Sequence, residues 1–339
     1  MDPKAGIVVI GASTGGVEAL LKLVAALPSD LRAVVLIVLH VGSHNSELPW
    51  LLDRCGGLPA RHAVDGDQIK AGQIYVAPPD HHMVIQQDRI SLTKGPRENW
   101  ARPAIDPLFR SAADVYGRDV IGVILTGALN DGTAGLYQVG QAGGTTIVQD
   151  PVDAINPSMP QSALAHVVVD YCLPMAEIAP LLVRLVEERS NMPALPASTA
   201  TEQPQEEEEM AAEFTQNTPV AVTCPDCGGA LRRRALGSLT QFACHIGHIY
   251  TADVMMAAQF LTLERCIESA MRSLGERAEL CRQMADKSLP GSGEASSWDA
   301  AMREAHEQAE PLREILTREW IHPDSLGVIG NMHPRRVVE

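Results

Sequence analysis

Hydrophobic positions in the first 190 residues follow two alternating patterns. Short aliphatic runs carry no regular polar alternation, which predicts strands buried on both faces. Between them lie segments whose apolar residues recur every three or four positions, which predicts helices. The predicted strands are Ile7–Ile10, Ala33–Leu39, Val120–Leu125, Thr145–Val148 and Val167–Val169, and the predicted helices are Val17–Leu27, Asp106–Val115, Thr133–Ala142 and Ala176–Val186.

Residues 1–190 therefore predict an α/β domain with a doubly wound, mostly parallel sheet and helices on both faces. Residues 73–93 depart from the alternation. There, the short runs Tyr75–Ala77, Met83–Gln86 and Ile90–Leu92 lie close together, which suggests a small antiparallel hairpin inserted in the domain.

The remaining chain divides into four predicted parts. Residues 191–220 contain several prolines and Glu206–Glu209, a composition too polar to order itself by burial, so we expect a solvated tether or, alternatively, an acidic docking peptide. Residues 221–250 form a small Cys/His module, and residues 322–339 a tail. Residues 251–321 show two apolar seams separated by a break at Ser288–Ser297, which predicts a helical hairpin with a kink or early end at Pro311.

Composition limits the classes of function. The net charge is −15, which argues against nucleic-acid binding through bulk charge. No apolar segment reaches the length of about 20 residues that spans a bilayer, so no membrane insertion is expected. The apolar run Ile7–Ile10 is too short for a secretory signal, and we expect a cytoplasmic location.

A glycine-rich loop, Gly11–Gly16, joins the first predicted strand to the first helix. Such a loop stabilises a negative charge, because free N–H groups and the positive end of the helix dipole both point into it. It can bind a nucleotide phosphate, or it can present Ser13 to a carbonyl and stabilise the oxyanion. The loop lacks the G-x-G-x-x-G and Lys-Ser/Thr patterns of nucleotide sites. On the loop alone, both functions and a purely structural turn stay open.

Two further polar residues follow predicted strands. His40 ends the strand 33–39, and Asp131 lies in the loop after the strand 120–125. Alone, each has an ordinary explanation, as a strand-end histidine and a helix N-cap. Together with Ser13, they would meet at the carboxyl edge of a parallel sheet as a nucleophile, a base and an orienting carboxylate. This combination favours a hydrolase over a non-catalytic scaffold or a nucleotide-binding protein.

Several motifs, in order along residues 6–188, make a more specific resemblance. They are Ile10–Gly16, His40, Tyr75–His82, Arg102–Asp106, Leu125–Gly127 and Asn130–Gly132. With these motifs the segment resembles the catalytic domain of the chemotaxis protein-glutamate methylesterases, the CheB-like family. The resemblance implies that Ser13 is the nucleophile, His40 the base and Asp131 its carboxylate, with no cofactor for catalysis. It also implies that the substrate is a glutamate methyl ester on a chemoreceptor or related signalling protein, and that glutamine deamidation can accompany this activity.

The resemblance also suggests residues around the substrate and the oxyanion. Thr14 and Gly15 lie beside the nucleophile, and Thr14 could position His40 or the substrate, or simply cap the helix. Ala128 replaces a methionine whose backbone N–H faces the oxyanion in the family. Arg102 could steer an acidic receptor helix or form a structural salt bridge. The chain starts at the catalytic strand without the family's usual receiver domain, which leaves its control open.

The Cys/His module has the spacing of a structural zinc site. Cys224 and Cys227 form a CxxC pair, and after 16 residues Cys244 and His248 form a CxxxH pair. His245 is an alternative fourth ligand, and unmetallated thiols are the alternative to zinc. A module of this size needs such a cross-link because its core is small. It shows no catalytic group, so we expect the module and helices to dock a partner or mediate self-association.

Overall fold

The computed structural model describes residues 6–40, 46–191 and 218–318. Most of the predicted linker, with Glu206–Glu209, and the predicted tail 322–339 lie outside the described residues. The described chain forms two compact units, the first ending at Val254 and the second beginning at Met255. We describe each unit by itself.

A seven-stranded sheet forms the centre of the first unit, with the strand order β3-β4-β2-β1-β7-β8-β9. All six pairings are parallel. The chain builds one side of the sheet from β1 outward and then returns to build the other side from β7. The carboxyl ends of β1, β2 and β7 therefore flank the point where the winding reverses, which is where α/β sheets usually bind ligands. The strands are β1 (Gly6–Ala12), β2 (Ala33–Leu39), β3 (Ala60–His62), β4 (Gln73–Val76), β7 (Val120–Ile124), β8 (Thr145–Gln149) and β9 (Tyr171–Leu173).

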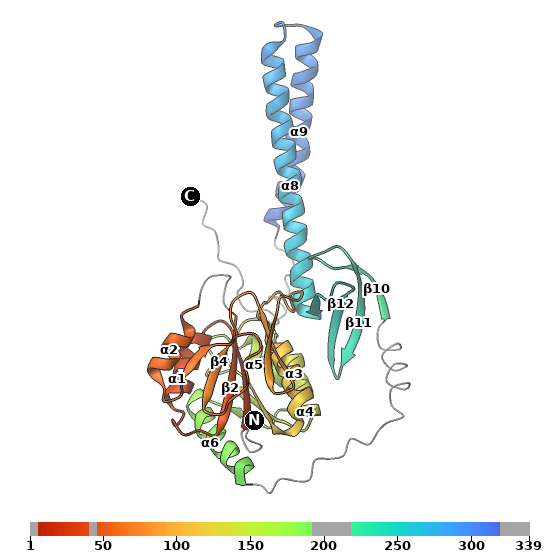
Figure 1. Ribbon diagram of the computed structural model, residues 1–339. Coiled ribbons are helices and arrows are strands. Elements are labelled where there is room, and N and C mark those ends of the chain that lie inside the picture. Colours follow the sequence, from red (N-terminus) through yellow and green to blue (C-terminus); the bar gives the residue numbers. More distant parts are fainter. Residues whose placement is uncertain (1–5, 41–45, 192–217, 319–339) are drawn as a thin grey trace. The chain divides into compact units, whose positions relative to one another are not determined.

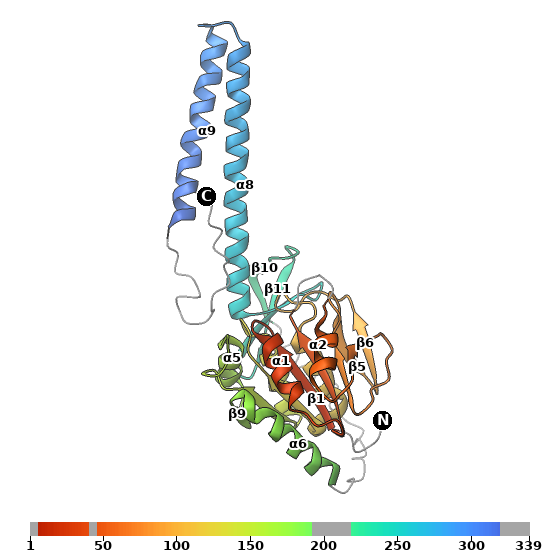
Figure 2. The ribbon, with the colours of Figure 1, turned by 90° about the vertical axis from the view of Figure 1, so that its left-hand side faces the viewer.

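Helices cover both faces of this sheet (Figures 1 and 2). Successive residues of β1 point to opposite sides: Val8 and Ile10 join one apolar cluster, and Ile7 and Val9 join the other. The first cluster includes residues of α1 (Gly16–Ala25), α2 (Leu48–Cys55) and α6 (Met175–Asn191). The second includes residues of α3 (Ile105–Tyr116), α4 (Thr133–Gln141) and α5 (Ser158–His166), and a short 3-10 helix, η1 (Gly117–Asp119), follows α3.

The predicted parallel α/β sheet is confirmed, with two corrections to its strands. The strand expected at Val167–Val169 is wrong, because Val168 is 95% exposed and the edge strand β9 begins at Tyr171. The run Tyr75–Ala77 does not belong to the small hairpin, because β4 pairs in parallel with β2 in the main sheet. The other two runs do pair as an antiparallel hairpin, β5 (His82–Gln86) with β6 (Arg89–Thr93).

A second, antiparallel sheet follows in the same unit. Its order is β10-β11-β12-β13, formed by β10 (Thr218–Thr223), β11 (Ala230–Leu236), β12 (Leu239–Cys244) and β13 (Ile249–Thr251). This small sheet carries the Cys/His residues. We call residues 218–251 the Cys/His module.

The second unit is formed by two long helices, α8 (Ala252–Lys287), whose first three residues belong to the first unit, and α9 (Gly293–Thr317). The two helices lie side by side in Figures 1 and 2. The break between them is shorter than expected, because Ser292 caps α9 by accepting a hydrogen bond from the Ala295 N–H. The early end expected at Pro311 is wrong, since α9 continues to Thr317. The α9 seam from Trp298 to Leu316 is buried or half-buried, whereas Leu263 of the predicted α8 seam is 41% exposed.

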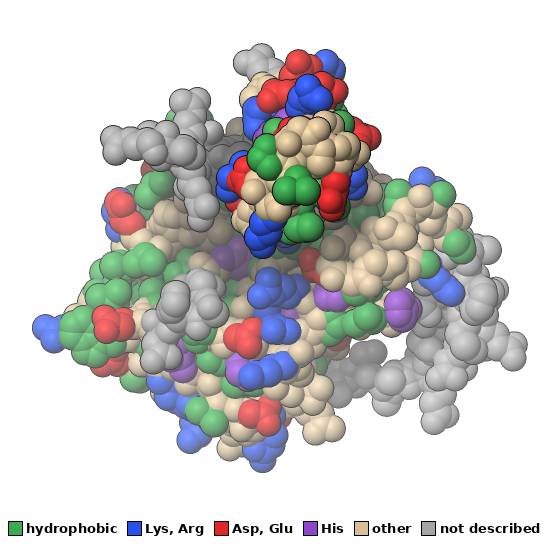
Figure 3. Space-filling model, turned by 90° about the horizontal axis from the view of Figure 1, so that it is seen from above, with side chains coloured by type: hydrophobic (Ala, Val, Ile, Leu, Met, Phe, Trp, Pro, Cys, Tyr) green, Lys and Arg blue, Asp and Glu red, His purple; other side chains and the backbone are tan. Residues whose placement is uncertain are grey.

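Within the described residues, no helix is long and apolar enough to cross a membrane. On the face seen in Figure 3, acidic and basic side chains are interspersed. The net negative charge is therefore not gathered into a single patch on that face.

Candidate active site and candidate metal centre

Ser13 lies in the sharp turn between β1 and α1. The turn requires glycine at position 15, where φ is +80° and a Cβ would come within 2.7 Å of the Ile155 side chain. The Ser13 N–H donates to the Thr126 carbonyl at 3.0 Å, which ties the turn to the loop after β7. The nucleophile candidate is thus held by two different strand ends.

The structure brings Ser13, His40 and Asp131 together. The His40 Nδ1 lies 3.2 Å from the Ser13 Oγ, and the His40 Nε2 lies 2.7 Å from the Asp131 Oδ2. The His40 backbone N–H donates to the Ala12 carbonyl at 3.1 Å, so the ends of β1 and β2 are joined beside the site. The imidazole bridges a half-buried hydroxyl and a carboxylate that is only 1% exposed.

Backbone and side-chain donors surround the Asp131 carboxylate. The Ile105 N–H donates to Oδ2 at 2.6 Å, while the Asn99 Nδ2 and the Asp106 N–H donate to Oδ1 at 3.2 and 3.4 Å. Burial alone would raise the pKa of Asp131, but His40 and these donors outweigh burial and lower that pKa. Asp131 is therefore held as an anion.

Asp106 shows the opposite behaviour beside it. Burial, and then the negative charge of Asp131, raise the pKa of Asp106 well above its ordinary value. Its Oδ1 accepts the Gly135 N–H at 2.7 Å, and its Oδ2 accepts the Asn99 amide at 3.1 Å. The motif Arg102–Asp106, expected at the rim of the crevice, contains Asp106, whose side chain is in fact fully buried. Asn99 was not predicted, because it lies in an irregular loop with no local pattern.

Three of the predicted substrate and oxyanion residues, Thr14, Gly15 and Ala128, offer backbone donors, whereas the Arg102 side chain already has partners. In the part of the chain that the structure describes, the backbone N–H groups of these three residues donate to no acceptor. The helix-cap alternatives do not hold: α1 is capped by Gly15 and α4 by Gly132, both without a side-chain hydrogen bond, so neither Thr14 nor Asp131 acts as a cap.

Arg102 is engaged in structural contacts. Its Nε and Nη2 both approach the Asp80 Oδ1, at 2.9 and 2.6 Å, and its Nη1 donates to the Gly95 carbonyl at 2.8 Å. The side chain is 21% exposed. These contacts support the salt-bridge interpretation, which fixes the loop after β4.

A serine, a histidine and a buried aspartate at the carboxyl edge of a parallel sheet is the arrangement of a serine hydrolase. Comparison with known proteins gives the family. The sequence model of the CheB methylesterase family matches residues 8–182. The chain therefore belongs to the CheB methylesterase family, a family of hydrolases.

Individual proteins of known name match about the same share of the chain as the family model does. A Leptospira interrogans protein is 40% identical over 181 residues, which are 52% of this chain and 93% of that protein. The Pyrococcus horikoshii protein-glutamate methylesterase/protein-glutamine glutaminase is 37% identical over 185 residues, 53% of this chain and 50% of that protein. The Thermotoga maritima CheB methylesterase catalytic domain matches with a TM-score of 0.52 and 35% identity, over 53% of this chain and 98% of that domain.

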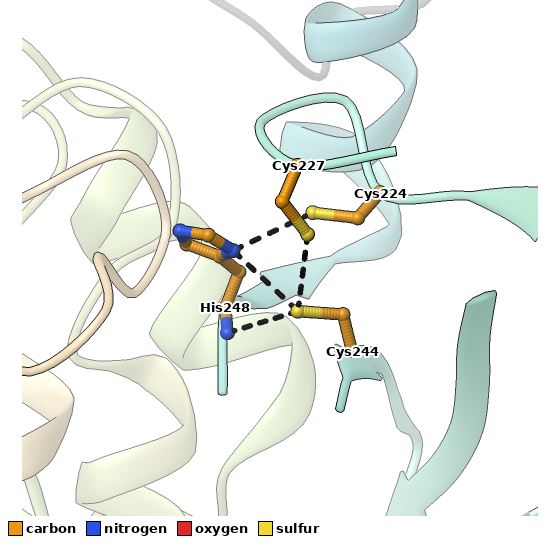
Figure 4. Close-up of side chains that lie close together, drawn as sticks. All are labelled: Cys224, Cys227, Cys244 and His248. Atoms are coloured by element: carbon orange, nitrogen blue, oxygen red, sulfur yellow. Dashed lines mark hydrogen bonds between the residues drawn. The ribbon is translucent and has the colours of Figure 1, made fainter. Parts of the chain in front are cut away.

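The second cluster of reactive side chains lies in the Cys/His module (Figure 4). One ligand atom from each of Cys224, Cys227, Cys244 and His248 lies within 4.8 Å of the others. The Sγ atoms of Cys227 and Cys244 are 3.8 Å apart, and the His248 Nδ1 lies 3.4 and 3.6 Å from the Sγ atoms of Cys244 and Cys224. A tetrahedral zinc with Zn–S of about 2.3 Å and Zn–N of about 2.0 Å separates its ligand atoms by about 3.5–3.8 Å. The three distances of 3.4–3.8 Å in the cluster are close to this spacing.

Contacts around the cluster suit a metal ligand set. The outer nitrogen of His248, Nε2, lies 4.0 Å from the Asp226 Oδ2, which accepts the Tyr250 hydroxyl at 2.7 Å, so a carboxylate stands near the ring without a direct hydrogen bond to it. Burial acts to raise the pKa of Cys244, but backbone N–H groups, with that of His248 first, lower the pKa of this thiol to about 7. A thiol of this kind readily supplies the thiolate that zinc requires.

Proposed function

We propose that this protein hydrolyses γ-methyl esters of glutamate side chains on a chemoreceptor-type protein, with Ser13, His40 and Asp131 as its catalytic set. The proposal rests on one observation: the His40 ring joins the Ser13 hydroxyl to the buried Asp131 carboxylate. Membership of the CheB methylesterase family and the names of the relatives support the substrate class. A cytoplasmic location remains a prediction of the sequence.

The geometry assigns the two ring nitrogens of His40. Asp131 is anionic, so the neutral ring carries its proton on Nε2, and this N–H donates a hydrogen bond to the carboxylate. That leaves the Nδ1 lone pair facing the Ser13 Oγ. Ser13 attacks the ester carbonyl carbon while Nδ1 takes the hydroxyl proton, and a tetrahedral oxyanion forms. When the C–O bond to methoxide breaks, Nδ1–H protonates the leaving oxygen and methanol departs.

The backbone N–H groups of Thr14, Gly15 and Ala128 are candidates for stabilising the oxyanion. Each lacks an acceptor in the described residues. Thr14 and Gly15 follow Ser13 directly, and Ala128 follows Gly127, where a Cβ would lie 2.9 Å from the Ser13 Cβ. A backbone donor does not depend on its side chain, so alanine at position 128 can serve as well as a larger residue.

The acyl-enzyme is then cleaved by water. His40 Nδ1 takes a proton from the water, which attacks the Ser13 ester. The glutamate carboxylate is released and the serine regains its proton. A glutamine side chain can enter the same cycle, with ammonia as the leaving group, as the relatives' second name suggests.

The test measures methanol released from methylated receptors by the full chain. Ser13→Ala should lower the rate by roughly three to six orders of magnitude. Ser91→Ala, a serine of β6 in the small hairpin, serves as the matched control and should retain the wild-type rate. Methanol release that survives Ser13→Ala would refute the proposed nucleophile.

We also propose that Cys224, Cys227, Cys244 and His248 bind a structural zinc ion. The support is the clustering of four ligand atoms within 4.8 Å of one another, with three of these distances at 3.4–3.8 Å, and the carboxylate of Asp226 near His248. The purified chain should contain one zinc per molecule by elemental analysis, and Cys227→Ser should lower that content. His245→Ala should keep the zinc, because His245 lies outside the cluster.

The role of α8 and α9 is a separate proposal. Several large apolar side chains of α8 are exposed, namely Met256, Leu261, Leu263 and Leu280, and they could contact a partner or a second copy of the chain. Sedimentation of the full chain over a range of concentrations tests self-association. A monomer at every concentration would exclude it.

A further inference from the structure

The Cys/His module makes direct backbone contacts with the loop beside the triad. The module strand β13 follows His248, the last residue of the metal cluster. The Asn99 N–H donates to the Ile249 carbonyl at 2.8 Å, and Glu98 forms a parallel bridge with the same residue. Residues 97–99 therefore extend the small sheet of the module.

The Asn99 side chain continues this contact to the triad. Its Oδ1 accepts the Thr251 N–H at 3.0 Å, and its Nδ2 donates to the Asp131 Oδ1 at 3.2 Å. Asn99 is 3% exposed and has a φ of +48°, a left-handed conformation that asparagine tolerates better than most residues. The amide is thus held between the module and the catalytic carboxylate.

A second connection reaches the residue before the carboxylate. The Thr251 hydroxyl donates to the Asn130 Oδ1 at 2.7 Å, and the Asn130 Nδ2 donates to the Asp253 carboxylate at 2.9 Å. Thr251 is fully buried and Asn130 is 2% exposed. Thr251 therefore holds both the loop that carries Asp131 and the amide that orients it.

We infer that Asn99 and Thr251 are positioning residues for Asp131. By this inference the Cys/His module completes the hydrolase site that residues 6–191 carry. The inference rests on the proposed role of the triad. It goes beyond that role because it assigns a catalytic purpose to a module that carries no catalytic group.

These contacts control the orientation of the Asp131 carboxylate. Asp131 must present Oδ2 to His40 throughout the reaction, including when the ring becomes an imidazolium. The Ile105 N–H fixes Oδ2, and Asn99 holds Oδ1 together with the longer contact of the Asp106 N–H at 3.4 Å. Without the Asn99 amide the carboxylate loses a charge-assisted hydrogen bond and can rotate, which misaligns the imidazole.

The experiment uses the full chain and a fluorophosphonate that reacts with the activated serine. Its second-order labelling rate reports activation of Ser13 without any assumption about the natural substrate, and its end point gives the fraction of active sites. Asn99→Ala should slow labelling about tenfold per active site. Thr251→Val should slow it several-fold, and Thr251→Ser, which keeps the hydroxyl, should restore it.

Two comparisons separate positioning from folding. Thr223→Val makes the same substitution on the exposed face of β10 and should leave the labelling rate unchanged. With methylated receptor as substrate, Asn99→Ala should lower kcat and leave KM unchanged, because the residue acts through Asp131. The double variant Asn99→Ala/Thr251→Val should lose less than the product of the single losses, since both act on one carboxylate.

The inference is overturned if Asn99→Ala and Thr251→Val label at the wild-type rate per active site. It is also overturned if their only effect is a smaller number of active sites, because that indicates a structural role alone. Failure of the proposed function has a different signature: Ser13→Ala would keep its methanol release, or the wild type would show none while still being labelled at Ser13.

Discussion

Asp106 and Asp131 share one amide nitrogen, the Nδ2 of Asn99, which lies 3.1 Å from the Oδ2 of the first and 3.2 Å from the Oδ1 of the second. Both carboxyl groups are buried, and their pKa values move in opposite directions. The surroundings therefore favour the protonated form of Asp106 and the anionic form of Asp131. This division of charge gives His40 an anionic partner and keeps a second anion out of the same buried pocket.

The raised pKa of Asp106 predicts that the stability of the fold depends on pH. A carboxyl whose pKa is raised by folding contributes fully below its unfolded pKa of about 4, and the contribution is lost as the pH rises through the raised pKa. Asp106→Asn cannot ionise, so it should lack this loss. The unfolding free energy of the variant minus that of the wild type should rise by up to about 1.4 kcal/mol per pH unit across this interval.

Urea denaturation at a series of pH values measures this difference. Asp114→Asn, an exposed carboxylate of the same helix α3, provides the matched control and should give a nearly constant difference. A constant difference for Asp106→Asn as well would show that Asp106 is ionised in the folded protein.

Asp131→Asn should keep the fold and lose most of the activity. The amide has the shape of the carboxylate but bears no charge, so it neither selects the Nε2–H tautomer of His40 nor stabilises the imidazolium. By analogy with other triads, kcat should fall by about 10⁴. Fluorophosphonate labelling and methanol release should fall together, and an unaltered labelling rate would remove Asp131 from the catalytic set.

The predicted active site illustrates what a sequence can reveal. Ser13 and His40 each end or follow a strand with an unbroken aliphatic run, and the rule that parallel strands share their carboxyl edge placed them together. Asp131 lies several residues after the end of β7, but this loop still places it at the carboxyl edge of the sheet beside His40. The local pattern and one topological rule were sufficient to predict that these three side chains lie close together.

The missed features depend on partners distant in the sequence. Asn99 contacts Thr251 across 152 positions, and nothing in its own irregular loop indicates this. The run around Tyr75 has the same pattern whether it pairs with a hairpin or with β2, so its place in the main sheet is decided by tertiary contacts. Val168 is apolar yet almost fully exposed, which no local rule anticipates.

A side chain at position 127 should disturb the nucleophile beside it. A Cβ at this position would lie 2.1 Å from the Met159 Sδ and 2.9 Å from the Ser13 Cβ. Gly127→Ala should therefore cost about 1–3 kcal/mol of stability through overpacking and should lower kcat by displacing Ser13. Thermal denaturation and methanol release measure the two effects.

A second substitution separates these effects. Met159→Ala in the Gly127→Ala background removes the closer clash, so stability should partly recover while activity stays low, because the contact with Ser13 remains. Gly275→Ala in α8, where a Cβ meets no atom within 4 Å, should leave activity unchanged. Full recovery of activity in the double variant would show that Ser13 is not displaced.

Removal of the metal should reach the triad through β13. If zinc holds Cys244 and His248, chelation should loosen the adjacent strand and the hydrogen bond from the Asn99 N–H to Ile249. Hydrogen exchange of peptides covering residues 97–99 should then accelerate about tenfold or more, and fluorophosphonate labelling of Ser13 should slow. Restored zinc should reverse both changes.

Peptides from the central strand β1 should keep their exchange rate, because their hydrogen bonds lie within the main sheet. Unchanged exchange at residues 97–99 after complete removal of the metal would show that the ion does not support the active site.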